Sequence, residues 1–442
     1  MGEGRVRALG GEPGKSIGRW HLEYFIKIRS RRRARQLEQK FVSQKLTTGY
    51  LTDMNTSLQK ILGAVLSLAL IGGMIFIRVR LSAGFDYQNS NFAFFWLAGR
   101  MMLDGENPYN ETQYLAGHET FGIKWQPNRI FPYPLPLAVL CMPFGFFPMG
   151  SAYLLWQVVS LLFIALTIHL LLNRWREAAQ RRLLLPLFSF MFFFGPEYLT
   201  LYTGAIGAFT LLLLTGAILL LEKEKSFPAG ALLALTMLKP PQGLTILLLA
   251  GLRLLARRDW KAIGGMALGG IGLLILGSML DPQWVAKFLG AGNAVMDRTL
   301  GVHSNVWAFA YLACKGASPC SALLGGTSSL ILLGTAGYYL WRNQAGMSAW
   351  EAMNVVILIG FVSTIYLWAY DQILYIIPIV WIAGTLVEKS KGYLYTFVFL
   401  ILLVLVSLFA LAQHAAAGSD VWSLGTTVLV LVFLFIVRRT NL

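Results

Sequence analysis

The sequence predicts an all-α membrane protein with about twelve membrane segments, and three observations support this fold class. Hydrophobic residues occupy 56% of the 442 positions and charged residues only 13%, against roughly 25% charged residues in soluble domains. The mean hydropathy is +0.60. Apolar runs long enough for membrane helices recur from Leu58 onwards, and most basic residues stand at the ends of these runs.

The excess of basic residues does not indicate a nucleic-acid-binding protein, despite a formal net charge of +16. The one basic cluster, Arg29-Ser30-Arg31-Arg32-Arg33-Ala34-Arg35, lies in an N-terminal segment, 1–57, that we expect to be cytoplasmic or interfacial. An amphipathic helix on an anionic leaflet and a basic tail that only fixes orientation both fit this segment. No recognised nucleic-acid module accompanies it, so membrane lipids are the expected partner and nucleic acid is not.

Residues 58–442 are expected to form a single transmembrane domain. The first span, about 61–77, follows the basic segment and therefore leaves from the cytoplasm, which places a first external loop at about 79–150. Within this loop the aromatic stretch 87–102 has helical spacing and is expected to lie in the outer interface. Both termini are expected in the cytoplasm of a multi-pass protein of the plasma or inner membrane.

Further apolar runs predict the remaining spans, and a second external loop is expected at about 281–321. From Ile373 the chain is expected to turn back into the membrane. The other spans are expected at about 152–172, 183–194, 206–221, 263–280, 323–341, 353–368, 393–412 and 422–437.

One apolar region, 227–255, is interrupted by Lys239-Pro240-Pro241. Each arm has a dozen or so residues, only about 18 Å of helix, which is short of the ~30 Å hydrocarbon core. We therefore expect a short helical hairpin with Lys239 at its tip. Non-helical backbone at such depth requires shielding by protein or by a water-filled cavity.

The three cysteines do not form a disulfide framework or a metal site. Cys141 lies in an apolar stretch and is expected to contribute packing. Cys314 and Cys320 flank a short turn in the second external loop, where a disulfide and two free thiols are both open alternatives. No phosphate-binding glycine motif for a nucleotide is present. No cofactor is required by the sequence, and a divalent cation stays open.

Polar residues are expected to converge on the outer half of the membrane. Asp86 follows the first span, Asp371-Gln372 lies at a late external turn, and Lys239 approaches from below. A carboxylate in such a cavity can take a proton from an acceptor hydroxyl, while cations hold a phosphate leaving group. The loops add further candidates for donor and substrate binding, namely Arg129, His303, Tyr87, Tyr133 and Asn305.

Each candidate also has a simpler interpretation. Asp86 fits a general base or a helix-end cap. Lys239 fits a donor-phosphate ligand or a lysine neutralised by a buried carboxylate. Asp371 could orient a sugar hydroxyl, steer the acceptor, bind a divalent ion or pair with a nearby cation. His303 fits either the active site or polar surface, and the two tyrosines fit either packing or binding.

Three sequence motifs resemble a known family. An Asp is followed by patterns like "G-x-x-P-Y" and "F-x-Y-P-P", and a later segment resembles "G…K-P…R-R". The residues concerned are Asp86, Leu103, Gly105, Pro108, Tyr109, Phe131, Tyr133, Pro134, Pro143, Gly230, Lys239, Pro240, Arg257 and Arg258. Together they resemble the GT-C superfamily of membrane glycosyltransferases, most closely the family 87 type of polyprenyl-phosphate-mannose-dependent mannosyltransferases.

This resemblance implies a GT-C-type bundle and an inverting enzyme of cell-envelope glycolipid biosynthesis. The implied donor is a polyprenyl-phosphate-linked sugar, mannose or another pentose or hexose, and the acceptor is a hydroxyl of a lipid or glycan. Asp86 would be the catalytic base at the extracytoplasmic face. The chain departs from the family pattern in having Gly204-Ala205 instead of Gly-Gln, Leu135 instead of a second proline, and Asp371-Gln372 where late histidines are usual.

The alternative function is a transporter or flippase of a lipid-linked sugar. A transporter needs access from both faces, polar residues near the midplane of several spans and, commonly, an internal repeat. The sequence has no evident repeat, and its candidate polar residues gather at the outer rim. The glycosyltransferase is therefore the predicted function.

Overall fold

The computed structural model describes residues 86–124, 129–388 and 392–439, except for the side chains of 292–299 and 439. The chain divides into two compact units, Met1–Arg78 and Val79–Leu442, and all described residues belong to the second. The expected N-terminal segment and the expected first span therefore lie outside the described residues.

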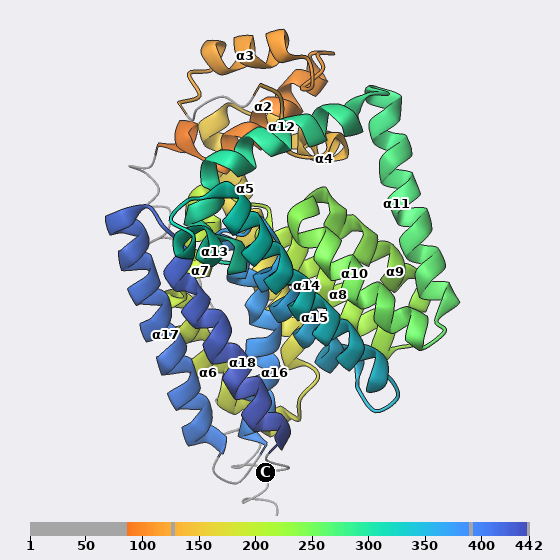
Figure 1. Cartoon of the computed structure of the whole chain (residues 1–442), viewed down its shortest axis with the longest axis vertical. Coiled ribbons are helices and arrows are strands. Elements are labelled where there is room, and N and C mark those ends of the chain that lie inside the picture. The colour runs from red at the N-terminus through yellow and green to blue at the C-terminus, as the bar shows by residue number, and fades with distance from the viewer. Residues whose placement is uncertain (1–85, 125–128, 389–391, 440–442) are drawn as a thin grey trace, which may run out of the picture. The chain divides into compact units, whose positions relative to one another are not determined.

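Every regular element in the described part of the chain is a helix, which confirms the predicted all-α class (Figure 1). Up to the middle of the chain the α-helices are α2 (Asn91–Leu103), α3 (Glu111–Thr120), α4 (Leu135–Gly145), α5 (Met149–Leu172), α6 (Glu177–Phe193), α7 (Gly195–Thr203), α8 (Gly207–Glu222), α9 (Ser226–Leu235) and α10 (Pro240–Ala256). They continue with α11 (Trp260–Leu280), α12 (Trp284–Thr299), α13 (Val306–Ala313), α14 (Ser318–Arg342), α15 (Ala349–Ser363), α16 (Ile376–Val387), α17 (Gly392–Ala417) and α18 (Leu424–Arg439). Short 3-10 helices are η1 (Tyr87–Asn89), η2 (Thr236–Leu238), η3 (Leu300–Val302), η4 (Ala369–Tyr375) and η5 (Val421–Ser423).

Six helices among the described residues are long and apolar enough to cross a membrane, and a seventh span results if α6 and α7, bent by 56°, count as one. The six are α5, α11, α14, η4 with α16, α17, and η5 with α18. Five further apolar helices have 10–17 residues. At 1.5 Å per residue they are shorter than the ~30 Å hydrocarbon core. The expected number of about twelve segments is therefore not confirmed.

The expected span at 353–368 illustrates why sequence and structure differ. Helix α15 ends at Ser363, and Thr364 is extended, with φ −69° and ψ 147°. The apolar run continues beyond this point, but its backbone is no longer helical until η4 begins at Ala369. The apolar run therefore extends beyond the end of the helix that forms within it.

The helix break at Lys239 is where the sequence predicted it. Helix η2 ends at Leu238, and α10 begins at Pro240. A residue before proline is disfavoured in the helical region, and Lys239 accordingly has φ −128° and ψ 81°. Proline is well suited to the first turn of α10, because its missing N–H has no helical partner there.

Helices α9 and α11 pack so closely that glycine is required at their contact. A Cβ atom added at Gly265 would lie 2.0 Å from the Phe227 carbonyl oxygen, and one at Gly230 would lie 1.9 Å from the Ala262 carbonyl oxygen. These distances exclude any side chain unless the helices move apart. The contact fixes the position of α9 and hence of Lys239, which follows it.

Helices α2, α3, α4 and α12 lie together at one end of the unit (Figure 1). Helix α2 covers most of the stretch 87–102, where the sequence has helical spacing, and its apolar side chains are almost all buried. Its location in the outer interface stays a prediction. The loop after α2 turns at Gly105, which has φ +77°. Beyond this turn the Asn107 amide donates a 2.9 Å hydrogen bond to Asp281, the residue after α11. The first loop is thereby joined to the end of α11.

The cysteines separate into one buried thiol and one disulfide. Cys141 is buried, as its apolar surroundings predicted. Cys314 and Cys320 are bonded to each other, with their Cα atoms 5.8 Å apart. The disulfide closes the turn between α13 and α14. Of the two alternatives that the sequence left open, a disulfide and two free thiols, the structure therefore has the disulfide.

We predict that Gly265→Ala lowers the free energy of unfolding by about 1–3 kcal/mol, because its methyl group would overlap the Phe227 carbonyl. The neighbouring Gly264 is the matched control, since a Cβ there would have no atom within 4 Å. Gly264→Ala should leave stability unchanged or raise it slightly, because alanine favours helix. Thermal unfolding of the detergent-purified variants measures both, and equal melting temperatures would contradict the close packing.

Candidate active site

Lys239 lies at the break between η2 and α10 and is buried, with only 3% of its side chain exposed. Its position follows from the double proline, which stops the helix and turns the lysine out of the regular backbone. An ammonium group at this depth is costly unless an anion compensates its charge. The partner must therefore come from elsewhere in the fold.

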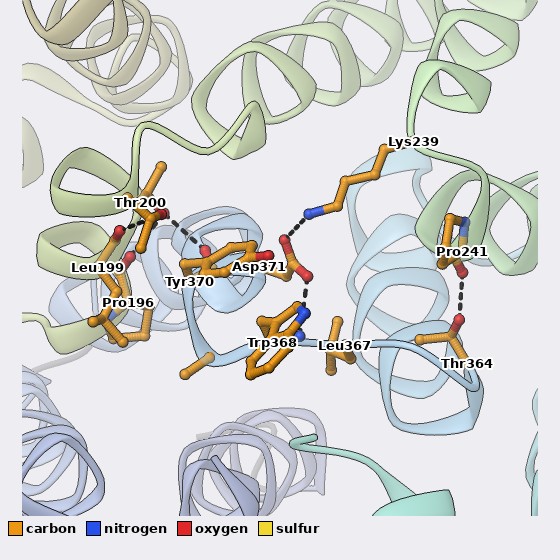
Figure 2. Close-up of polar contacts among 12 residues, drawn as sticks. Pro196, Leu199, Thr200, Lys239, Pro241, Thr364, Leu367, Trp368, Tyr370 and Asp371 are labelled. Carbon is orange, nitrogen blue, oxygen red and sulfur yellow. Dashed lines mark hydrogen bonds and ion pairs between the residues drawn. The ribbon is translucent and has the colours of Figure 1, made fainter. Parts of the chain in front are cut away.

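That partner is Asp371, 132 positions later in the chain (Figure 2). The Lys239 Nζ donates a hydrogen bond to Asp371 Oδ1, and the Asp371 side chain is fully buried. The second oxygen, Oδ2, accepts the Trp368 N–H at 3.1 Å. The ammonium also lies 4.8 Å from the centroid of the Tyr370 ring. Both charges are thus compensated within one cluster of contacts.

Helix η4, which carries Asp371, is held by side chains from several other elements. The Thr200 hydroxyl on α7 donates to the Tyr370 carbonyl oxygen at 2.8 Å (Figure 2). The Ala369 N–H donates to Asp420 at 2.6 Å, and the Gln372 amide donates to the Ser423 carbonyl oxygen at 2.9 Å. These contacts replace the hydrogen bonds that a continuous α-helix would supply.

A second side-chain contact ties the two unwound segments together. The Thr364 hydroxyl donates to the Pro241 carbonyl oxygen, beside the Lys239–Asp371 pair (Figure 2). Thr364 belongs to the extended stretch between α15 and η4, and Pro241 to the first turn of α10. The ion pair and this hydrogen bond fix the relative position of the two breaks.

His303 lies next to this cluster and is buried, which excludes the polar-surface interpretation. The centroid of its ring is 4.6 Å from that of Tyr366 and 4.8 Å from that of Trp368. Burial lowers the pKa of His303 from 6.5 to about 4, so its imidazole is neutral at physiological pH. The following residue, Ser304, donates its N–H to the Leu367 carbonyl oxygen at 2.9 Å, which fixes His303 beside η4.

Asn305 and Tyr133 approach the same region with different roles. The Asn305 side chain accepts the Ala308 N–H at 2.9 Å and thereby caps α13. Tyr133 packs its ring 4.9 Å from that of Phe95. Burial raises the pKa of the Tyr133 hydroxyl well above 10, and the nearby Tyr366 and Asp371 raise it further. Tyr133 therefore stays protonated close to the carboxylate.

Asp86 occupies a different environment, at the start of the first loop. Its side chain is 42% exposed and pairs with Lys124 at 2.8 Å, whereas its helix, η1, receives no side-chain cap from it. The following Tyr87 is also partly exposed, and its ring centroid is 6.3 Å from that of Tyr153. Arg129 is exposed and pairs with Glu111 at 2.8 Å.

The predicted site residues thus fall into two groups. The structure brings Lys239 and Asp371 into contact and places His303, Gln372 and Tyr133 around them. In the described part of the chain no hydrogen bond or ion pair joins Asp86, Tyr87 or Arg129 directly to the Lys239–Asp371 pair. The role of each predicted residue in catalysis or binding stays a prediction.

Sequence reasoning did not identify the partners Lys124 and Tyr370. Lys124 stands in a loop 38 positions from Asp86, and no local pattern marks it as a counter-ion. Tyr370 stood in the turn that contains Asp371, where an aromatic residue next to a carboxylate was the available signal. Only the fold shows that the Tyr370 ring covers the lysine.

The residues available for a metal are few. Among the described side chains, no three or more His, Cys, Asp or Glu residues are grouped so that they could hold an ion.

A small recess beyond η4 has room for about one water molecule. It is lined by Gln372, Ser407, His414, Ser423 and Thr426, among others.

The comparison with known families now adds to this geometry. The chain matches the model of "Glycosyltransferase family 87" over residues 131–365, more than half of its 442 residues. The chain belongs to glycosyltransferase family 87. No curated protein and no solved structure shows significant similarity to it.

The family match covers part of the site of this family 87 glycosyltransferase. Lys239, His303, Asn305 and Tyr133 lie inside the matched residues, whereas Asp86 precedes them. Asp371 and Gln372 follow them. The match therefore supports a sugar-transferring membrane enzyme without assigning its acidic residues.

We predict that Lys239→Met destabilises the protein by about 3–5 kcal/mol, because it leaves the Asp371 carboxylate buried without a counter-ion. The double variant Lys239→Met/Asp371→Asn should recover most of this loss, since asparagine is neutral and still accepts the Trp368 N–H. Thermal unfolding in detergent measures the three proteins. A double variant no more stable than the single one would contradict the proposed importance of charge compensation.

Proposed function

We propose that this family 87 glycosyltransferase is an inverting enzyme that uses a polyprenyl-phosphate-linked sugar, with mannose as the first candidate. The acceptor is a hydroxyl of a lipid or glycan. In a single displacement the acceptor oxygen bonds to the anomeric carbon, and the bond from that carbon to the phosphate oxygen breaks. The electron pair leaves with the phosphate, and the acceptor proton passes to a carboxylate. Family membership is the observation that carries the transferase assignment.

Asp86 is our candidate for that carboxylate because it is accessible. Asp371 is fully buried, and both of its oxygens accept hydrogen bonds, one from Lys239 and one from Trp368. Asp86 is 42% exposed, and its Oδ2 is held by Lys124. An acceptor hydroxyl arriving from solvent can therefore reach Asp86 and not Asp371. General-base catalysis needs this direct approach to the reacting proton.

Lys239 is our candidate for the donor phosphate. Its ammonium has three N–H donors, and Asp371 accepts one of them. Because Asp371 already compensates its charge, a phosphate there would need further cations and a path to Lys239, whose side chain is only 3% exposed. Lys124 and Arg129 are engaged by Asp86 and Glu111 and would have to exchange these partners for the phosphate. We place His303, Asn305, Gln372 and Tyr133 around the sugar and Tyr87 beside the acceptor. The double variant Lys239→Met/Asp371→Asn is expected to fold but lacks the ammonium group. A raised donor KM in this variant would therefore indicate lost phosphate binding and not a folding defect.

We further propose that the site faces the extracytoplasmic side of the cell membrane. The Cys314–Cys320 disulfide supports this orientation, because disulfides persist in oxidising compartments. The bridge lies between α13 and α14, and α13 follows directly on His303 and Asn305. An oxidising location for this disulfide supports an extracytoplasmic position for the neighbouring site residues as well.

We predict that Asp86→Asn lowers sugar transfer at least about 100-fold while leaving the melting temperature unchanged. The assay offers purified enzyme polyprenyl-phosphate mannose and other polyprenyl-phosphate sugars, with extracted membrane lipids as acceptors, and identifies the product by mass spectrometry. Asp104→Asn is the matched control, since Asp104 is an equally exposed loop carboxylate that pairs with Arg100. Full activity in Asp86→Asn would remove Asp86 from the catalytic role.

We predict that the Cys314–Cys320 turn is accessible from outside intact cells. A membrane-impermeant reductant followed by an impermeant maleimide should label these cysteines without permeabilisation. Cys141 is buried and should stay unlabelled, and the double variant Cys314→Ser/Cys320→Ser supplies the blank. Labelling that appears only after permeabilisation would contradict the proposed orientation.

A further inference from the structure

Asp420 joins three separate segments around the proposed site. It lies between α17 and η5, and its side chain is only 1% exposed. Its backbone N–H donates to the Val302 carbonyl oxygen at 2.7 Å, and its Oδ2 accepts the Ala369 N–H at 2.6 Å. Its Oδ1 lies 2.7 Å from His414 Nδ1. One buried residue thus holds the segment before His303, the start of η4 and the end of α17.

The turn that Asp420 begins holds η4 on both sides of Asp371. The Ser423 N–H donates to the Asp420 carbonyl oxygen at 2.8 Å. The Ser423 carbonyl oxygen in turn accepts the Gln372 amide at 2.9 Å. Ala369, which the carboxylate holds, precedes Asp371 by two residues, and Gln372 follows it directly. The position of this turn therefore constrains where Asp371 and the buried ion pair lie.

His303 is likewise held on both of its sides. On one side, the Val302 carbonyl oxygen is bonded to Asp420. On the other side, the Ser304 N–H donates to the Leu367 carbonyl oxygen at 2.9 Å. A bond at one point leaves two segments free to turn about it, whereas bonds at two separate points fix their relative orientation. The Asp420 contacts are the second point that fixes the His303 segment against η4.

His414 allows Asp420 to keep a carboxylate in the interior. A buried carboxylate without a partner is costly. Because His414 Nδ1 faces a carboxylate oxygen, this nitrogen carries a hydrogen, and protonation of Nε2 makes the ring a full counter-ion. The His414 side chain is 36% exposed, so Nε2 can exchange protons with the surroundings.

We infer that Asp420 is a positioning residue that fixes His303 relative to the Lys239–Asp371 pair. The inference rests on the proposed function, in which Lys239 holds the departing phosphate and His303 lies beside the sugar. These two groups contact opposite ends of the bond that breaks, so their relative position has to stay constant. A misplacement of about 1 Å can cost on the order of 100-fold in rate. Asp420 acts through the backbone of both segments.

A double-mutant cycle between Asp420 and His303 tests the inference. Asp420→Ala removes both side-chain contacts of Asp420, while η4 keeps its bonds to Thr200 and Ser423. It should raise the donor KM for polyprenyl-phosphate mannose about tenfold and lower kcat about tenfold, because one donor no longer meets both contacts. In a His303→Ala background, Asp420→Ala should change the donor KM by less than about twofold, because the contact that it positions is gone. An unchanged donor KM in Asp420→Ala, or an equal rise without His303, would overturn the inference.

Two further substitutions of Asp420 separate the length of the side chain from its charge. Asp420→Asn keeps the length and an oxygen for the Ala369 N–H, so the donor KM should stay within about threefold of the wild-type value. Asp420→Glu keeps the charge but adds a methylene group that displaces Ala369, so the donor KM should rise as in Asp420→Ala. Asp420→Glu also replaces Asp420→Ala in the cycle if the alanine variant does not fold. A wild-type KM in Asp420→Glu, or a rise in Asp420→Asn equal to that of Asp420→Ala, would contradict positioning.

Tyr375→Phe is the matched control for a general loosening of η4. Its hydroxyl is also buried in η4, but its 2.8 Å partner is Thr427 on α18, away from the His303 segment. Loss of folded enzyme lowers the apparent kcat and leaves KM unchanged, so the donor KM is the informative quantity. Tyr375→Phe should lose some thermal stability and keep the donor KM within about twofold. A rise in KM equal to that of Asp420→Ala would show a general structural effect and overturn the positioning role.

The outcome also distinguishes this inference from the proposed function. If the wild-type chain transfers no sugar from any polyprenyl-phosphate donor, the proposed function fails and the positioning role fails with it. If the wild-type chain is active and Asp86→Asn is inactive, but the Asp420 variants keep the wild-type donor KM, only the positioning role is overturned.

Discussion

The buried ion pair between Lys239 and Asp371 is the interaction on which the arrangement of the site depends. Neither charge is tolerable alone at this depth, because desolvation costs several kcal/mol for each ion. Each residue lies at a departure from regular α-helix, Lys239 between η2 and α10 and Asp371 within η4. The pair therefore joins two irregular segments that the sequence separates by 132 positions. Because the ion pair joins the break at Lys239 to η4, the position of one of these segments constrains the position of the other.

Irregular backbone of this kind needs partners that water cannot supply inside a membrane protein. Around η4 they are side chains of other segments, namely Thr200 of α7 and Asp420 before η5. Thr364, in the extended stretch before η4, bonds to the Pro241 carbonyl oxygen at the other break. The segment Ala369–Val387 is correspondingly enclosed, with 89% of its most apolar stretch buried, whereas α11 is only 11% buried and lies at the periphery. Protein enclosure thus makes a non-helical segment compatible with this depth.

The two acidic residues of the proposed site differ in the way that their proposed roles require. Asp86 is half exposed and has an exposed lysine as its partner, so it stays accessible to an incoming hydroxyl. Asp371 is enclosed and engaged at both oxygens, so it is suited to fixing Lys239 rather than to proton transfer. The difference in burial between Asp86 and Asp371 therefore supports the two proposed roles.

The sequence by itself determined the all-α class, most helix positions and the break at Lys239, because hydrophobic periodicity and the Pro240-Pro241 pair act over a few residues. It also identified the family, since the matching motifs are local. Only the tertiary structure decided that Asp371 is the partner of Lys239, that Lys124 pairs with Asp86, and that His303 is buried against Tyr366 and Trp368. The number of full-length spans was likewise beyond the sequence, because an apolar run such as 353–368 continues past the end of its helix. These features depend on contacts between distant segments, and a local pattern carries no information about which distant segment will pack against it.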